Sequence, residues 1–524
     1  MRRLLVAAII VTALAAAPAQ PRHLALRTTA VDIVVDGVID AAWATADSTG
    51  EFFQMEPYYG KPPSGSTTAK VLTGADALYC LIICRNNAYP VQSVTGLLDQ
   101  GSGDVVSIML DTFDDRQTAY KFAVTAGGVR ADARLLDDAR NRDYSWDGVW
   151  FAESRVEPWG FVVEMKIPYK SIRFNASLRE WGLDFDRWSP GSKEDLYWSV
   201  YERNEGQRIS KFGRLDLGDF HPARTGLNLE LYPVGIARAK ELTGRNARVE
   251  PDAGVDIFYN PSEHLTAQLT ANPDFAQIEA DPFQFNISRY ESYLTERRPF
   301  FTEGNEVFMA SGKERNSGFY QPLELLYTRR IGRSLPDGNE VPLLVGTKAF
   351  GRAQGWEYGG FYSLTGETDY LLDGVKTTEG RASFASARVK KTILDNSSVG
   401  ILIAGKSSPG FTEGVVDVDG AFRTSEGQLA YQVARSFRGN SGDFAGSAGY
   451  RSNSKTWLGL ARLRAIGTEF DVDQVGFVPW RGSMNAAVIT GPVWYYDTGS
   501  LSQLTIYGGG ALAYEHADLY TDAA

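Results

Sequence analysis

The residues of this chain best suited to chemistry are aromatic rings with charged neighbours. Trp146 lies close to Arg142 and next to Asp147, and Trp188 lies further along the chain. An apolar sugar face stacks on an aromatic ring, while the sugar hydroxyls bond to charged side chains. We therefore expect these four residues to be candidate sugar-binding residues. Other tryptophans lie within strand patterns and suit a buried core instead.

A cluster of carboxylates is a candidate metal site. Asp111, Asp114 and Asp115 offer hard oxygen ligands at the density that Ca²⁺ prefers. A solvated turn would use the same residue types, so both readings stay open. Apart from this Ca²⁺ site, the sequence predicts no cofactor.

Two patterns resemble enzyme motifs. Gly400 to Ser407 has the spacing of a phosphate-binding loop, but Ser408-Pro409-Gly410 follows where that loop needs a helix. We expect a strand and a turn there. A pair of carboxylates could also serve a glycosidase, although no spacing selects two of the four candidates: Glu56, Asp147, Glu164 and Asp186.

Composition limits the partners of the chain. It has 524 residues, with 53 Lys and Arg against 64 Asp and Glu, and it contains no long basic run. Nucleic acid is therefore not expected as a partner. The length predicts two or three domains. The few His and Cys are too scattered for a zinc site, and Cys80 and Cys84 share one apolar run that predicts a buried strand.

The N-terminus predicts export. Arg2 and Arg3 precede an uncharged stretch, and Ala17-Pro18-Ala19 offers small residues for cleavage, so we expect a signal peptide over residues 1–19. The apolar run is too short for a membrane-spanning helix, and no later segment reaches that length. An exported chain of this kind is either secreted or an outer-membrane barrel.

Residues 31–220 predict a β-sandwich, because many short β-type runs are separated by turn residues. The runs are 71–72, 79–84, 105–110, 120–124, 149–153, 161–167 and 181–185.

From about residue 224, apolar and polar residues alternate over about ten residues at a time, as in 265–272 and 428–435. One face of each segment is apolar, whereas the other carries Thr, Gln, Asn and small residues. Aromatic residues near the segment ends suit a membrane interface. This pattern predicts an antiparallel transmembrane β-barrel of roughly 12 to 14 strands. A large soluble sandwich or propeller is the alternative.

Several motifs resemble known families. The motifs 36–43, 76–79, 106–111 and 163–168 resemble the family 9 carbohydrate-binding module. The motifs 271–281, 296–304 and 327–333 are similar to an uncharacterised outer-membrane family that carries such a module ahead of a β-barrel domain of unknown function. The resemblance implies an all-β chain, with the module in the periplasm and the barrel in the outer membrane.

We accordingly expect a sandwich over 20–223 and a barrel over 224–524. The polar segment 274–308 cannot face lipid, so we expect it in the barrel lumen, where arginines would pair with acidic residues. The chain ends at Ala524 without a terminal aromatic residue, so the barrel could be incomplete. The expected luminal charges are Asp274, Glu279, Asp281, Arg297, Arg298, Glu303, Arg329 and Arg330.

These features favour a non-catalytic envelope protein that recognises or passes a glycan or oligosaccharide, with outer-membrane lipid as its second partner. One alternative is a hydrolase of O-glycosyl bonds, or an accessory subunit, in carbohydrate catabolism. The other is a structural envelope protein whose sandwich binds another protein.

Overall fold

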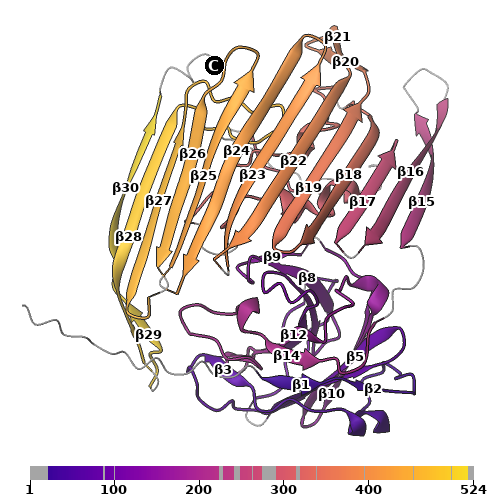
Figure 1. Cartoon of the computed structure of the whole chain (residues 1–524), viewed down its shortest axis with the longest axis vertical. Helices are drawn as coiled ribbons and strands as arrows, with labels where there is room; N and C mark the ends of the chain where they lie inside the picture. Colours follow the sequence, from indigo (N-terminus) through magenta and orange to yellow (C-terminus); the bar gives the residue numbers. More distant parts are fainter. Residues whose placement is uncertain are drawn as a thin grey trace, which may run out of the picture.

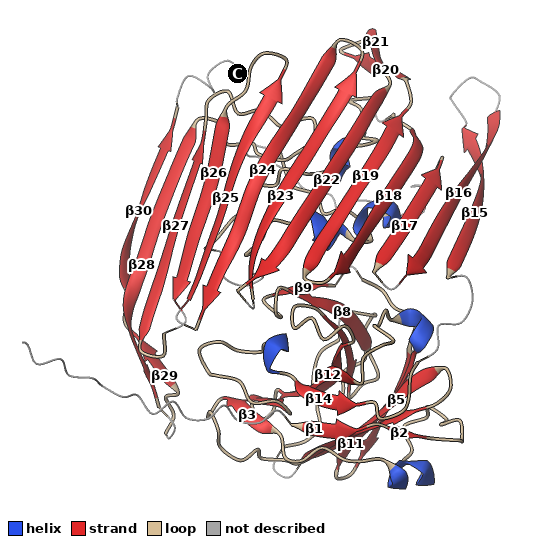
Figure 2. Cartoon of the chain, in the orientation of Figure 1, coloured by secondary structure: helices blue, strands red, loops and turns tan. Residues whose placement is uncertain are grey.

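The computed structural model describes residues 22–516, except 87–88, 100, 145, 223–227, 241–247, 263, 274–290, 314–318, 338, 395, 426, 453 and 497–498. The expected signal peptide and the predicted luminal residues Asp274, Glu279 and Asp281 lie outside these residues. Strands dominate the described part of the chain, and helical turns are few and short (Figure 2). Among the described residues, no helix has the length and apolarity needed to span a membrane.

The N-terminal part is a β-sandwich, which lies at one end of a much larger sheet (Figure 1). Its nine-stranded sheet has the order β1 (His23–Ala25), β14 (Gly213–Asp216), β12 (Glu180–Ser189), β6 (Val105–Asp111), β7 (Ala119–Thr125), β8 (Arg130–Leu136) and β9 (Asn141–Asp143). In addition, β13 (Glu194–Tyr197) pairs with β12, and β3 (Phe53–Glu56) pairs with β13. Its five-stranded sheet has the order β10 (Phe151–Glu157), β11 (Gly160–Pro168), β5 (Ala77–Arg85), β4 (Thr67–Thr73) and β2 (Arg27–Thr28). The 3-10 helices are η1 (Ala41–Thr45), η2 (Tyr169–Ser171) and η3 (Ile209–Lys211).

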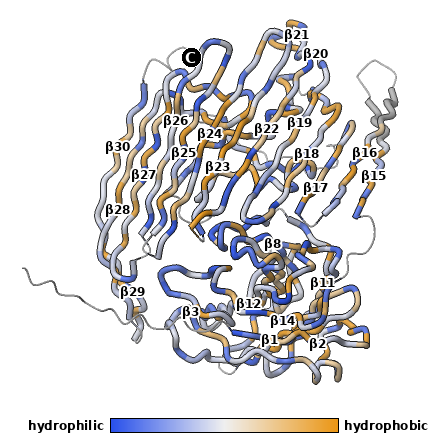
Figure 3. The backbone as a smooth tube through the Cα atoms, viewed as in Figure 1, coloured by the Kyte–Doolittle hydropathy of each residue, from blue (hydrophilic) through white to orange (hydrophobic). Residues whose placement is uncertain are grey.

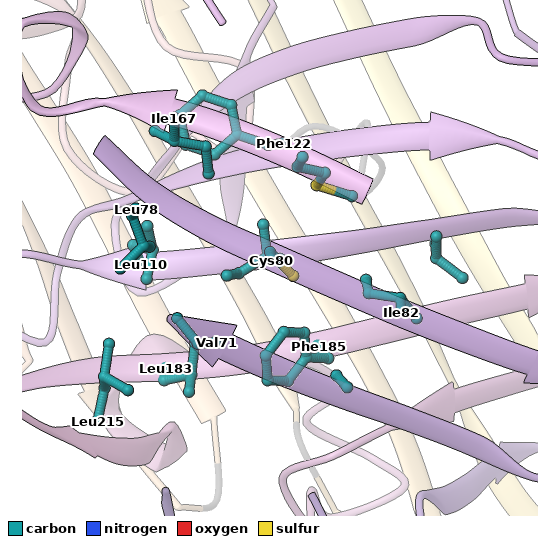
Figure 4. Packing of buried hydrophobic residues seen from close by; sticks show 14 of the residues in the cluster. Val71, Leu78, Cys80, Ile82, Leu110, Phe122, Ile167, Leu183, Phe185 and Leu215 are labelled. Carbon is teal, nitrogen blue, oxygen red and sulfur yellow. The ribbon is translucent and has the colours of Figure 1, made fainter. Parts of the chain in front are cut away.

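The two sheets enclose one apolar core, as expected for a sandwich. Cys80, Phe122, Ile167 and Phe185 come from both sheets and meet there (Figure 4). Cys80 and its neighbour Cys84 are free and buried. They therefore serve as core side chains in the strand predicted for them.

The first motif of the sandwich has a structural role. The indole Nε1 of Trp43 donates to Glu164 Oε1 at 2.9 Å, and the backbone N–H groups of Asp36 and Gly37 donate to Glu164 Oε2. Gly37 has φ +75°, a conformation that disfavours other residues. Glu164 thus fastens the N-terminal segment to β11 through both of its carboxylate oxygens.

The C-terminal part is a 14-stranded antiparallel sheet, with a separate hairpin of β20 (Thr368–Leu372) and β21 (Val375–Glu379). The fold class is therefore all-β, as predicted, and the strand count lies at the top of the expected range. Among the described residues, β15 and β30 do not pair, so no closed barrel is found. The strands are β15 (Leu229–Lys240), β16 (Arg248–Ser262), β17 (Leu265–Ala271), β18 (Leu343–Ala353), β19 (Trp356–Thr365), β22 (Ala382–Ile393), β23 (Ser397–Ser408), β24 (Phe411–Thr424), β25 (Gly427–Arg438), β26 (Phe444–Ser452), β27 (Trp457–Ile466), β28 (Ser483–Tyr495), β29 (Gln503–Thr505) and β30 (Gly508–Glu515).

The described residues of 291–342 pack against one face of this sheet. They include α1 (Pro299–Thr302), η4 (Asn305–Phe308) and η5 (Thr328–Arg330). Phe300, Phe308 and Leu325 join Phe350 and Phe361 of the sheet in one apolar cluster. The described part of the segment expected in the lumen therefore covers a sheet face.

Candidate functional site

Trp188 near the end of β12 is the most exposed tryptophan of the sandwich. Successive side chains of β12 point to opposite faces of the sheet, and Trp181, Leu183 and Phe185 point into the core. Trp188 follows Phe185 by three residues, so its side chain lies on the opposite face of the sheet. It is 42% exposed. A ring held by a strand with one side open suits stacking against a ligand.

Charged side chains surround Trp188 on this face. Asp195 of β13 is its cross-strand partner, and Asp186 precedes it by two residues. Lys121 of β7 approaches Asp186 Oδ2 with its Nζ at 2.5 Å. Cross-strand neighbours on one face lie within reach of each other. We call the surface formed by Trp188, Asp186, Asp195, Lys121 and Arg142 the Trp188 face.

Strand register places Arg142 on the same face. Arg142 pairs with Leu135, and Leu135 pairs with Ala119, so these three side chains share one face of the sheet. Ala119 lies three residues from the core residue Phe122, so this face is the one that points away from the core. The Nη2 of Arg142 donates to Gln207 Oε1 at 3.1 Å. Of the four predicted sugar-binding residues, Arg142 and Trp188 therefore share one face.

Two groups of the Trp188 face, Asp195 and Arg142, have altered pKa values. Burial, followed by the neighbouring charge of Asp186, raises the pKa of Asp195 to about 7. Burial alone would lower the pKa of Arg142, but Tyr144 and Tyr197 raise it above the usual value. Near neutral pH, Asp195 can therefore either donate or accept a hydrogen bond, as a sugar hydroxyl also does.

Tyr89 is a second exposed ring near Trp188, and sequence reasoning missed it. It lies against the turn that follows β12, where a Cβ added to Gly191 would be 3.0 Å from the Tyr89 Cβ. The side chain is exposed. Tyr89 and Gly191 are about 100 residues apart in the sequence, so their contact can be recognised only in the folded structure.

Trp146 and Asp147 occupy a different place. The Trp146 ring packs against Tyr120 and Phe122, with centroids at 5.0 and 5.8 Å. Phe122 belongs to the core, so Trp146 closes the inner face of the sheet, opposite Trp188. Asp147 is exposed in the adjacent loop. The four predicted residues therefore do not form one site.

The acidic cluster builds the turn between β6 and β7. Asp111 accepts hydrogen bonds from the backbone N–H groups of Phe113, Asp115 and Arg116. Asp115 accepts from Gln117 and Thr118 in the same way, while Asp114 pairs with Arg214. In the described part of the chain, no group of three or more potential ligands could hold a metal ion. The Ca²⁺ site remains an untested prediction.

The arginines of the expected luminal network have local partners. Arg298 pairs with Glu296, at 2.7 Å between Nη2 and Oε2, and Arg330 pairs with Glu291 at 2.7 Å. Sequence reasoning selected neither of these glutamates. Each of the two ion pairs joins residues from within 291–330.

The remaining predicted charges bond mainly to backbone or to the sandwich. Arg329 Nη2 donates to the carbonyl of Thr295 at 2.8 Å. The backbone N–H of Arg297 donates to Glu296. Glu303 lies 3.7 Å from Arg173 of the sandwich, so it links the segment to the N-terminal domain.

The phosphate-loop-like pattern is a strand, and two of the four candidate carboxylates have structural partners. Residues 400–407 form part of β23, and Phe411 begins the next strand after a tight turn, as predicted. Asp186 is engaged by Lys121, and Glu164 by Trp43 and backbone amides.

Asp184, on the same face as Asp186, allows a test by pH. Burial raises the pKa of Asp184 to about 7, although Tyr201 and the Ser199 N–H donate to it. A raised carboxyl pKa favours the protonated form in the folded state, so this group costs stability increasingly as pH rises from about 4 through about 7.

Asp184→Asn cannot ionise. We expect its free energy of unfolding, relative to wild type, to rise by about 1.4 kcal/mol per pH unit across that window. Urea unfolding of residues 22–222, which contain their own core, measures this. A difference independent of pH would show that Asp184 is ionised throughout.

Comparison with known proteins assigns both parts of the chain. Residues 35–219 match the model "Carbohydrate family 9 binding domain-like", and residues 225–345 match "Domain of unknown function (DUF5916)". No curated protein matches the chain.

Two solved structures illustrate the likenesses. The chain is similar to a family 9 carbohydrate-binding module from Caldicellulosiruptor kristjanssonii in complex with cellotriose, at 18% identity over 40% of this chain and 100% of that chain, with a TM-score of 0.28. It is also similar to OmpT, an outer membrane protein of Vibrio cholerae, at 10% identity over 55% of this chain and 96% of that chain, with a TM-score of 0.19. Such TM-scores do not establish a shared fold, so the assignment depends on the family models. Residues 35–219 therefore form a family 9 carbohydrate-binding-module-like domain, and a match to DUF5916 follows over residues 225–345.

Proposed function

We propose that this protein recognises a glycan at the bacterial outer membrane, binding it on the Trp188 face without cleaving it. The observation that carries the proposal is the open ring of Trp188 beside Asp186, Asp195 and Arg142. A sugar needs this combination, because its C–H face stacks on an aromatic ring and its hydroxyls bond to charged groups. The match of residues 35–219 to the family 9 carbohydrate-binding model supports the same ligand class.

The polarity of the large sheet supports its placement in a membrane. Val389, Ile401, Val418 and Val433 follow one another in register across β22 to β25, and each is 41–53% exposed. On the other face, Arg388, Asp417, Asp419 and Gln432 are buried. Apolar residues recur along the strands of this sheet (Figure 3). Outward apolar and inward polar residues are typical of a sheet surrounded by lipid.

Turn lengths support a periplasmic position for the sandwich. At the end of the sheet that faces the sandwich, Gln354 and Gly355 alone join β18 to β19, and three residues join β22 to β23. At the other end, residues 467–482 join β27 to β28. Outer-membrane barrels have short periplasmic turns and longer extracellular loops.

A glycan array with the full chain in detergent tests the proposal. For any glycan bound, Trp188→Ala should weaken affinity by about tenfold or more, since a lost stacking contact of about 1.4 kcal/mol has that effect. Trp146→Ala is the matched control, because its ring packs inside the sandwich; it should lower stability and leave the affinity of the folded protein unchanged. Wild-type affinity in Trp188→Ala, or release of cleaved products, would contradict the proposal.

A further inference from the structure

Asp137 of the sandwich inserts its carboxylate between two cations of the large sheet. Its Oδ2 lies 3.2 Å from Arg423 Nη2 of β24, and its Oδ1 lies 3.9 Å from Lys390 Nζ of β22. The backbone N–H of Gly312 also donates to this carboxylate. Two cations and a backbone amide are the groups that bind a free anion in proteins. We call Arg423, Lys390 and the Gly312 amide the anion socket.

Arg423 is held in place by contacts that do not involve the sandwich. Its Nε donates to Gln428 Oε1 at 2.7 Å, and its Nη1 donates to the carbonyl of Asn396 at 2.8 Å. The remaining amino group, Nη2, is the one that faces Asp137. The side chain is 1% exposed, so its charge acts in a region that water screens little. The large sheet therefore directs a fixed cationic donor toward the sandwich.

The turn that carries Asp137 has an unfavourable backbone conformation. Asp137, Asp138 and Ala139, between β8 and β9, have φ values of +53°, +59° and +62°. Residues other than glycine rarely adopt this left-handed conformation, and three in succession need support from tertiary contacts. The strands β8 and β9 lie at the end of the sandwich next to the large sheet (Figure 1). The conformation of the turn thus places the Asp137 carboxylate in the socket.

The acidity of Asp137 shows that the socket favours an anion. Burial alone would raise the pKa of this carboxyl, but the charges of Arg423, Lys390 and Arg140 hold the pKa well below its usual value. The socket therefore stabilises an ionised carboxylate more than a neutral group of the same shape.

A cavity of about 480 Å³ adjoins the socket, and groups from both domains line it. Asp137, Lys390 and Ser398 belong to its wall. The volume lies within the range of small-molecule sites. A small solute in this cavity therefore lies beside the socket.

The cavity wall also contains a hydroxyl without a partner. Ser398 is 3% exposed, and within the described part of the chain its Oγ has no hydrogen-bond partner. Ser398 pairs with Thr392 of β22 and with Ala421 of β24. Lys390 and Arg423 each lie two residues away on those strands, so Ser398 lies diagonally between them. A buried hydroxyl without a partner is costly, so it marks a position for a ligand oxygen.

We propose that the anion socket binds a small solute that carries a carboxylate, and that Asp137 occupies the socket as a built-in competitor while the sandwich is docked. The external carboxylate replaces Asp137 between Arg423 and Lys390 and accepts a hydrogen bond from Ser398. Because Asp137 joins the sandwich to the sheet, the solute also loosens that contact. This site is separate from the Trp188 face and does not depend on the glycan proposed there.

Acetate is the probe, because it carries the same carboxylate as an aspartate side chain. Asp137→Gly removes the competitor, and glycine accepts the left-handed backbone. In the full chain in detergent, sodium acetate should raise the melting temperature of Asp137→Gly, because it binds the folded state. Acetamide, and sodium chloride at equal ionic strength, should not.

The wild-type protein tests the competition. Calorimetry should show that it binds acetate at least tenfold more weakly than Asp137→Gly does, because Asp137 must first leave the socket. Acetate should also speed hydrogen exchange in residues 134–143 of the wild type, relative to chloride at equal ionic strength.

Three further variants locate the anion. Asp373→Gly is the matched control, since Asp373 also has a left-handed φ of +52° but lies in the separate β20–β21 hairpin; its melting temperature should not respond to acetate. Adding Arg423→Gln to Asp137→Gly should abolish the acetate effect. Adding Ser398→Ala instead should weaken acetate binding severalfold without lowering the melting temperature in chloride, because it removes an unpartnered hydroxyl.

A folded Asp137→Gly protein that does not respond to acetate, or that responds equally to acetamide, would overturn the carboxylate site. An acetate effect that survives both Arg423→Gln and Ser398→Ala would place the anion outside the socket and overturn the proposal as well. Equal acetate affinities of the wild type and Asp137→Gly would overturn the role of Asp137 as competitor.

Discussion

Val418→Arg should destabilise the large sheet by about 2 to 4 kcal/mol if its outer face lies in lipid, because an arginine near the bilayer midplane carries that cost. Val418 lies in β24 between Ile401 and Val433 of the neighbouring strands, in the middle of the apolar row. On a water-facing sheet, the same change would alter stability by no more than about 0.5 kcal/mol.

Urea unfolding in lipid vesicles measures the effect of Val418→Arg. Leu372→Arg is the control, because Leu372 is equally exposed but belongs to the separate β20–β21 hairpin. We expect the control variant to unfold as wild type does, and to reach the outer membrane in normal amounts. If both variants behave alike, the apolar row does not contact lipid.

The strands of the large sheet were predictable because their side chains repeat with a period of two. The alternation of apolar and polar residues in 428–435 indicates a strand, and β25 includes the whole run. Closure of a barrel was a weaker prediction, since it depends on pairing between the first and last strands. Alternation within a strand contains no information about that pairing.

The candidate site was predictable only in part. Trp146 and Trp188 have similar neighbours in the sequence, but which of them faces the core depends on register. Phe122, Ile108 and Phe185 align across three strands, and this alignment places Trp146 inside and Trp188 outside. Tyr89 and the cavity wall arise from contacts between distant segments, which no local pattern encodes.

The arginines that were expected in a lumen show the same limit. The sequence indicated that buried arginines would need acidic partners, and the described pairs fulfil that requirement. Their identity depended on the path of residues 291–330, which brings Glu291 to Arg330 and Thr328 to Glu296. The loss of stability expected on removing an arginine therefore depends on how deeply the fold buries that arginine.

Arg388→Ala should destabilise the protein by about 3 to 5 kcal/mol, because it removes one partner of a fully buried ion pair. Arg388 donates from Nη1 and Nη2 to the two oxygens of Asp419, at 2.6 and 2.8 Å, and neither side chain is exposed. Asp417 lies on the same face of β24, two residues before Asp419. Loss of the guanidinium would leave two buried carboxylates without this cation.

Arg330→Ala is the matched control, because Glu291 is half exposed and solvent weakens that pair to about 0 to 1 kcal/mol. The double variant Arg388→Met with Asp419→Leu should recover much of the lost stability, since removing both charges avoids an unpaired one. Urea unfolding in detergent distinguishes the three variants. An Arg388→Ala protein as stable as Arg330→Ala would mean that water reaches Asp419, so that the inner face of the sheet encloses a wet lumen at this depth.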